Sequence, residues 1–209
     1  AGGTIGLDFN FRDNDNNNDP AQATVYAWSD NSTGAAFPTK IPDRWGDASL
    51  GDLPQTPYSG IISIPGVIQA ENYDVAGEGI SYHDTTPTNL GGAYRSDGVD
   101  IEATTDIGGG YNVSYIETGE WLEYTINVVG TGDYSIRMRV ASESAGGTFS
   151  ILLDGQSIAS AKMLAATGNW QNCTSIIVPA RPLTAGQHIL RVSMDTGGWN
   201  LNYIDVVSN

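Results

Sequence analysis

The chain has 209 residues and carries 9 Lys and Arg against 24 Asp and Glu, which gives a formal net charge of -15 at pH 7. Nucleic acids, anionic lipids and sulfated or uronic polymers are usually bound by clustered basic side chains, so this composition argues against them as main partners. No run approaches the roughly 18 apolar residues of a membrane span. The start Ala1-Gly2-Gly3 lacks the basic and apolar regions of a signal peptide. We therefore expect a soluble chain that has been processed or excised from a longer one.

The first segment contains two short stretches that alternate between apolar and polar residues, 5–11 and 24–28, and each is typical of a β-strand. Between them, oxygen-bearing side chains occupy alternate positions, as in the first half of a calcium loop: Asp13, Asp15, Asn17 and Asp19. An EF-hand is excluded, because Asn18 stands where its loop needs Gly and Thr24 where it needs Glu. A calcium loop and a solvated hairpin loop both fit this run.

A stretch rich in Pro and Gly, residues 51–60, separates this segment from the rest of the chain and is typical of a linker. Beyond it, short alternating apolar runs recur between turn signals, and each fits a strand: 64–70, 99–103, 111–116, 121–128, 134–140, 148–153, 174–178, 188–192 and 201–206. We find no helical period longer than one or two turns. The pattern predicts an all-β antiparallel β-sandwich of the jelly-roll type, preceded by a short segment of strands and loops.

Three carboxylates lie close together around one predicted strand, namely Glu117, Glu120 and Glu123. Glycoside hydrolysis needs two carboxylates that face each other across the scissile bond, whereas acids at these positions of a strand would not all share a face. We expect them to cap the hairpin and to solvate the outer face. Cys173 is the only cysteine, which excludes an intrachain disulfide, and we expect it to pack as a small apolar residue.

Two tryptophans stand in Gly-rich loops where the loops join strands. Trp170 follows Gly168-Asn169, and Trp199 follows Gly197-Gly198. An exposed aromatic ring in a loop can stack on the C–H face of a sugar, while neighbouring amides such as Asn200 bind hydroxyls without adding charge. The alternative is that one of these tryptophans plugs the end of the sandwich.

Eight short motifs follow one another between about residue 62 and the C-terminus: 68–74, 108–116, 119–124, 132–134, 139–142, 167–171, 183–186 and 200–205. Each motif is weak alone. In this order over about 145 residues, they resemble the family 6 carbohydrate-binding modules, which are non-catalytic β-sandwiches appended to enzymes that degrade polysaccharides.

The resemblance implies a ligand site in the loops at one end of the sandwich, where a Tyr and a Trp clamp a sugar ring and an Asn binds its hydroxyls. By motif, these residues are Tyr115, Trp170 and Asn200, with Trp199 as an additional wall and Tyr111 as the alternative Tyr. Some relatives instead or additionally bind along a concave sheet face, and no motif here decides that point.

The resemblance also implies a structural calcium ion near the ends of the domain. By motif, its side-chain ligands are Gln69 and Glu71 on the first strand and Asp205 on the last, and backbone carbonyls complete the shell. Such an ion would stabilise the fold by joining the two strands, and it would take no part in catalysis.

The predicted organisation has three parts. Residues 1–51 resemble the closing part of a family 9-like carbohydrate-binding domain, residues 52–61 form a linker, and residues 62–209 form the family 6-like sandwich. The implied function is that of a secreted, monomeric, non-catalytic module that holds a covalently linked catalytic domain on a neutral polysaccharide of the agarose, β-1,3-glucan or xylan type. Two alternatives remain open at this point: an adhesive module that binds a protein partner, and a small glycoside hydrolase that uses Glu117, Glu120 and Glu123.

Overall fold

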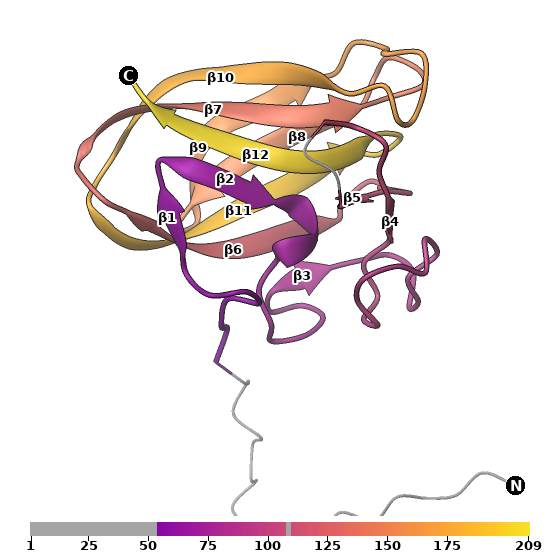
Figure 1. Cartoon of the computed structure of the whole chain (residues 1–209), viewed down its shortest axis with the longest axis horizontal. Coiled ribbons are helices and arrows are strands. Elements are labelled where there is room, and N and C mark those ends of the chain that lie inside the picture. The colour runs from indigo at the N-terminus through magenta and orange to yellow at the C-terminus, as the bar shows by residue number, and fades with distance from the viewer. Residues whose placement is uncertain (1–53, 108–109) are drawn as a thin grey trace, which may run out of the picture. The chain divides into compact units, whose positions relative to one another are not determined.

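The computed structural model describes residues 54–107 and 110–209 (Figure 1). Two of the expectations above fall outside this part of the chain. They are the family 9-like segment over residues 1–51 and the acidic run from Asp13 to Asp19.

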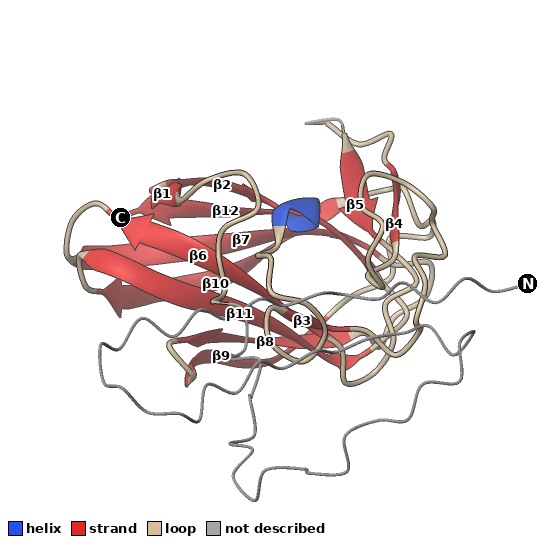
Figure 2. Ribbon diagram, turned by 90° about the horizontal axis from the view of Figure 1, so that it is seen from below, coloured by secondary structure: helices blue, strands red, loops and turns tan. Residues whose placement is uncertain are grey.

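In these described ranges, twelve strands form two sheets that face each other (Figure 2). The first sheet has the order β1-β6-β11-β8-β9, with β3 also paired to β6. Its strands are β1 (Ile62–Ile64), β3 (Tyr82–His83), β6 (Trp121–Val128), β8 (Thr148–Leu153), β9 (Gln156–Met163) and β11 (Gly186–Thr196). The second sheet has the order β10-β7-β12-β5-β4, with β2 also paired to β12. Its strands are β2 (Gly66–Gln69), β4 (Ile101–Ala103), β5 (Tyr111–Val113), β7 (Gly132–Ala141), β10 (Thr174–Leu183) and β12 (Asn200–Ser208).

The prediction of an all-β antiparallel sandwich is confirmed. Every strand pair in the described residues is antiparallel except β1 with β6, which run parallel. The one helical element described is a single 3-10 turn, η1 (Ala70–Asn72), and no helix there could span a membrane. The sequence did not predict β1, β3 or β9. The run 64–70 shares only Ile64 with β1, β3 has two residues, and β9 is mostly small and polar.

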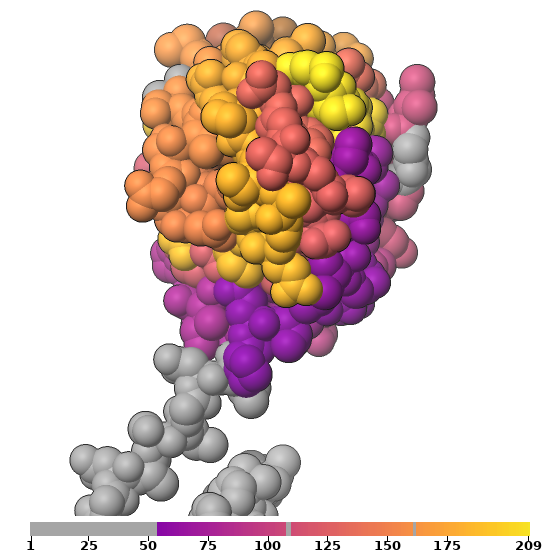
Figure 3. Space-filling view, turned by 90° about the vertical axis from the view of Figure 1, so that its left-hand side faces the viewer, coloured from indigo at the N-terminus to yellow at the C-terminus, as the bar shows by residue number. Residues whose placement is uncertain are grey.

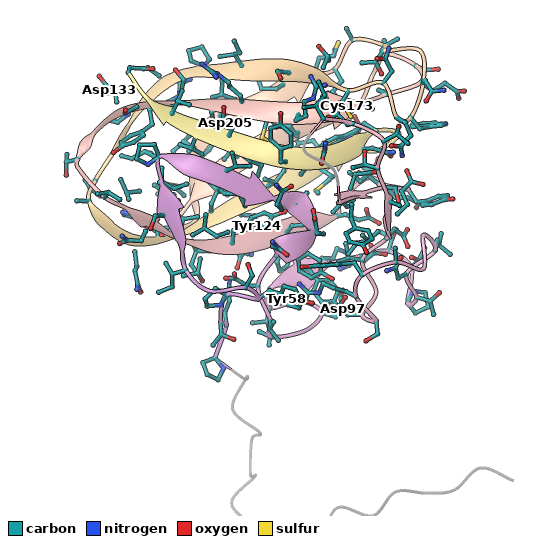
Figure 4. All side chains as sticks on the ribbon, viewed as in Figure 1. Tyr58, Asp97, Tyr124, Asp133, Cys173 and Asp205 are labelled. Carbon is teal, nitrogen blue, oxygen red and sulfur yellow. The ribbon has the colours of Figure 1, made fainter. Side chains whose placement is uncertain are left out.

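The core follows from alternation along the strands. On β7, Tyr134, Ile136, Met138 and Val140 are buried, while the residues between them point outward. Side chains at every second position of a strand share one face, so one such row covers the inside of each sheet. The hydroxyl of buried Tyr124 on β6 donates to the carbonyl of Ala70 at 2.9 Å, which ties η1 to the first sheet (Figure 4).

The two ends of the sandwich differ. One end holds the turns between β6 and β7 and between β10 and β11, and it has a rounded surface (Figure 3). The loops that precede β4, β10 and β12 gather at the other end, on the right of Figure 1. Loops held on a rigid sandwich are a common place for binding sites, so a site is expected at this second end.

Residues 54–60, which the sequence assigned to the linker, contact the sandwich. Thr56 and Val75 exchange two backbone hydrogen bonds, of 3.1 and 2.7 Å, and the side chain of Gln55 donates to Asp74 at 2.9 Å. The part of the linker that the structure describes is therefore joined to the domain that follows it.

Candidate functional site: a pocket at the loop end

A pocket of about 800 Å³ opens at the loop end of the sandwich. Its lining comes from segments far apart in the sequence: residues 86 and 90, Glu102 on β4, residues 114–118 after β5, Trp170 before β10, and residues 196–200 around the start of β12. All four ligand-binding residues predicted from the sequence, Tyr115, Trp170, Trp199 and Asn200, line this one pocket.

Two of these residues present aromatic rings to solvent. Tyr115 is 55% exposed and Trp170 is 41% exposed, although large aromatic side chains are usually well buried. Tyr115 also has a φ of 51°, a left-handed conformation that is unfavourable for a bulky residue. Residues in such conformations gather at functional sites, where the surrounding structure enforces them. The fold thus holds two exposed rings in the same pocket.

Trp199 differs from the prediction. Its side chain is 0% exposed, its indole nitrogen donates to the carbonyl of Thr196 at 2.9 Å, and its ring packs against Phe149 with the centroids 5.8 Å apart. A buried ring cannot stack on a sugar, so the expectation of an exposed platform at Trp199 was wrong. The residue plugs the end of the sandwich and supports the pocket from below.

Asn200 is also buried, at 3% exposure. Its amide nitrogen donates to Glu102 and to the carbonyl of Trp170, both at 3.0 Å. Its side-chain oxygen accepts no hydrogen bond from the described residues. Asn200 therefore fixes the backbone beneath the Trp170 ring and keeps one acceptor for the pocket.

Glu102 is the pocket residue that the sequence did not reveal. Its Oε1 accepts hydrogen bonds from the side chains of Gln171 at 2.7 Å, Asn200 at 3.0 Å and Asn112 at 3.4 Å. One carboxylate therefore orients the amides on both sides of Trp170. The only available signal was a charged residue within the predicted strand 99–103, and such a residue is ordinarily a solvated one.

Another wall of the pocket belongs to the loop between β3 and β4, through Thr86 and Leu90. Buried carboxylates hold this loop: Asp100 accepts from the backbone of Leu90, and Glu120 accepts from the Thr85 hydroxyl at 2.8 Å. Burial raises the pKa of Asp100 to about 6.

The three clustered glutamates have structural partners. Glu120 also accepts from the backbone nitrogen of Glu117 at 2.9 Å, which caps the turn before β6 as expected. The expectation that the glutamates solvate the outer face was wrong for Glu120 and Glu123, because both are buried. Glu123 receives the Arg191 guanidinium at 2.7 Å. With Glu120 and Glu123 buried and hydrogen-bonded, this arrangement offers no facing catalytic pair.

Cys173 is half-buried, and burial raises the pKa of its thiol to about 12, so the thiol stays protonated at neutral pH (Figure 4).

A separate group of polar atoms surrounds η1. Three buried side-chain oxygens lack a hydrogen-bond partner within the described ranges: Oε1 of Gln69, Oε2 of Glu71 and Oδ1 of Asn202. Gln69 lies opposite Tyr203 in the β2–β12 ladder, one residue from Asn202. Burial raises the pKa of Glu71 to about 7. In contrast, Asp205 forms an ion pair with Arg137 at 3.3 Å on the partly exposed outer face. No set of three His, Cys, Asp or Glu residues in the described ranges could hold a metal ion.

The comparisons with known proteins identify the class of this domain. The model of the carbohydrate binding module family 6 matches residues 92–208, more than half of the chain. The chain therefore belongs to this family of non-catalytic carbohydrate-binding modules.

Two solved structures of this family resemble the chain. The carbohydrate-binding module CBM6cm-2 of Cellvibrio mixtus lichenase 5A, solved in complex with cellotriose, is 33% identical; the match covers 69% of this chain and 98% of that chain, with a TM-score of 0.53. The C-terminal family 6 module of LamC, a marine laminarinase from Zobellia galactanivorans, is 30% identical over 68% of this chain and 98% of that chain, also with a TM-score of 0.53.

Among curated proteins, the Clotting factor G alpha subunit of Tachypleus tridentatus is 36% identical over 115 residues, which are 54% of this chain. The chain spans only 17% and 23% of the lengths of the curated relatives it matches.

Proposed function

We propose that the loop-end pocket binds a neutral polysaccharide and holds a longer enzyme on it. The observation that carries this proposal is the pair of exposed rings, Tyr115 and Trp170, in one pocket with fixed hydrogen-bonding groups beside them. Sugar rings stack on aromatic faces, and hydroxyls pair with amides and carboxylates. The described lining contains Glu102 and Glu117 and no Lys or Arg, which disfavours sulfated and uronic sugars.

The binding step needs little rearrangement. Tyr115 and Trp170 supply the contact area, and the free oxygen of Asn200 accepts from a sugar hydroxyl. Glu102 keeps the Trp170 backbone and Asn200 in place, so few side chains must be ordered when the ligand arrives. A weak and reversible contact of this kind raises the local concentration of a linked catalytic domain at its substrate.

The ligand class is a neutral β-glucan, agarose or xylan. A relative solved with cellotriose and a relative from a laminarinase support the β-glucan within this set. The net charge of -15 supports an uncharged polymer. We also infer that the chain is a secreted, monomeric part of a polysaccharide-degrading enzyme.

Native affinity electrophoresis in gels that contain laminarin, barley glucan, cellulose derivatives, xylan or agarose tests the function. We expect one neutral polymer to retard the protein and Trp170→Ala to abolish the retardation, because the ring is one of the two exposed stacking surfaces in the pocket. Trp121→Ala is the matched control. Trp121 does not line the pocket, and the Arg191 guanidinium covers its ring, with Cζ 3.8 Å from the ring centre. Retardation that survives Trp170→Ala would place the site elsewhere, and retardation by none of the polymers would contradict the function.

We further propose a structural calcium ion beside η1. Calcium is a hard cation that binds oxygen ligands. Gln69 and Glu71 each have a buried oxygen without a hydrogen-bond partner, so both predicted ligands stay in the proposed set. Asn202 replaces Asp205 as the ligand from β12, because its buried Oδ1 also lacks a partner, whereas Asp205 is paired with Arg137. An ion held there would satisfy all three oxygens and connect β2 with β12.

A further inference from the structure

Residues 54–60, called here the N-terminal strap, contact the loop between β3 and β4, which forms one wall of the pocket. The ring of Tyr58 lies over the Arg95 guanidinium, 4.4 Å from ring centre to Cζ, and contacts the Tyr94 ring edge-on at 5.6 Å. On its other side, the same guanidinium lies 3.6 Å from the ring centre of Tyr73. Arg95 is therefore enclosed between two tyrosine rings, one from the strap and one from the sandwich.

The strap completes the burial of this cation. The Arg95 side chain is only 6% exposed, and it also binds the Asp97 carboxylate at 2.7 Å and the backbone carbonyl of Tyr73. Figure 4 shows Tyr58 and Asp97 near each other beside the sandwich. Figure 3 shows the indigo start of the described chain lying against its body. Without the Tyr58 ring, one face of the guanidinium would be open to water.

A continuous set of contacts leads from Arg95 to the pocket. The backbone carbonyl of Arg95 accepts a hydrogen bond from the side chain of Asn89 at 3.0 Å. The Asn89 oxygen in turn accepts from the backbone nitrogens of Gly92 at 2.8 Å and Ile101 at 2.9 Å. Leu90, the next residue, lines the pocket and is 55% exposed. One side chain, Asn89, thus joins the strap-bound part of the loop to its pocket wall.

We propose that Tyr58 is a positioning residue for the pocket: through Arg95 and Asn89, it fixes the Leu90 wall against which a glycan binds. This inference rests on the proposed function, and it adds that the segment before β1 is a working part of the binding module. A truncation that begins the module at β1 would then bind less tightly than one that keeps residue 58.

Two readouts test the proposal in the full chain: the Kd for the retarding glycan by calorimetry, and amide hydrogen exchange without ligand. For Tyr58→Ala, we expect Kd to rise about two- to fivefold, from the usual worth of one cation–π contact, and exchange at Leu90 and Gly92 to accelerate. Tyr58→Phe keeps the ring and should retain both wild-type values. Gln55→Ala is the matched strap control, because it removes the bond to Asp74 and leaves Tyr58 in place; it should change neither readout.

The readouts separate the failure of this inference from the failure of the proposed function. A wild-type protein that binds no glycan contradicts the function, while exchange at Leu90 and Gly92 still reports on the coupling. Unchanged exchange in Tyr58→Ala would overturn the coupling. Accelerated exchange with an unchanged Kd would show that the strap stabilises the loop without serving the site. An equal loss of affinity in Tyr58→Phe or Gln55→Ala would also overturn the proposed role of the ring.

Discussion

At the scale of single residues, the two loop tryptophans show what a sequence pattern can and cannot decide. Both follow Gly-rich turns, yet Trp170 is 41% exposed and Trp199 is fully buried. The Trp199 ring lies against Gly147, which has no side chain to block it: a Cβ added at Gly147 would lie 2.6 Å from the ring. That contact joins residues more than fifty positions apart in the sequence, so local sequence could not reveal it.

Asp205, the predicted calcium ligand on β12, faces outward for a related reason. A strand read with period two puts residues 201, 203 and 205 on one face. In the structure, the pairing of β12 with β7 shifts between Leu201 and Tyr203, and Leu201 is buried while Tyr203 and Asp205 face outward. A β-bulge of this kind changes which side chains point inward, and the sequence carries no reliable sign of it.

Glu102 gives the prediction that belongs to this scale. In Glu102→Gln, one charged acceptor becomes a neutral amide, so Gln171 and Asn200 lose the carboxylate that orients them. Hydrogen bonds to a charged group are worth about 1.5–3 kcal/mol, and we expect affinity for the glycan to fall about tenfold or more. Calorimetry on Glu102→Gln, with exposed Glu143→Gln as the control, measures this. Unchanged affinity would remove Glu102 from the site.

At the scale of elements, most of the fold could be predicted. Alternating runs marked β6 and β8 with their observed bounds, because buried and partly buried residues alternate over most of both strands. The loops were harder, since their positions depend on which strands become neighbours. The pocket combines the turn before β12 with the segment after β5, and these meet through the pairing of β5 with β12 and through a hydrogen bond from the backbone nitrogen of Gly198 to the carbonyl of Ile116 at 2.9 Å.

Gly197 provides the prediction for these loops. A Cβ at this position would lie 2.3 Å from the backbone oxygen of Ile116 and 2.7 Å from the Cα of Glu117. Gly197→Ala must therefore push the segment that carries Tyr115 away from β12. We expect a loss of about 1–3 kcal/mol in the free energy of unfolding and weaker glycan binding. Chemical denaturation and calorimetry test this against Gly130→Ala, where nothing lies within 4 Å; equal behaviour of the two variants would contradict it.

At the scale of the whole molecule, the family and the sandwich were within reach of the sequence, whereas the attachment of the strap was not. Pro and Gly in residues 51–60 predicted a linker. Tyr58 nevertheless packs on Arg95, because the folded chain brings this cation, which belongs to the loop between β3 and β4, within 4.4 Å of the Tyr58 ring centre. The Pro and Gly content of a segment indicates its backbone conformation, and it does not predict which residues the segment contacts in the folded protein.

Calcium binding gives the prediction at this scale, because the proposed ion joins the first and last strands of the second sheet. Calcium at a hundredfold excess over its Kd should stabilise the fold by about 2.7 kcal/mol. The corresponding rise in Tm is about 5–10 °C for a domain of this size. Scanning calorimetry with calcium or with chelator measures it.

Two variants separate the proposed ligand sets. Glu71→Gln should remove most of the calcium effect on Tm, while Asp205→Asn should keep it, because Asp205 is bound to Arg137. A calcium effect that disappears in Asp205→Asn would restore the ligand set predicted from the sequence. The absence of any calcium effect on the wild-type protein would exclude the ion.

The course of β12 has a mechanical consequence. This strand begins at the pocket with Asn200 and ends at Ser208, and β7 pairs with it along that length while β5 and β2 pair with its other side. Tension between a captured glycan and the C-terminal end of β12 would run along the strand axis. Hydrogen bonds perpendicular to that axis are loaded together in shear, rather than opened one by one. The element that presents Asn200 to the pocket is thus also the one best placed to carry a pulling force through the domain.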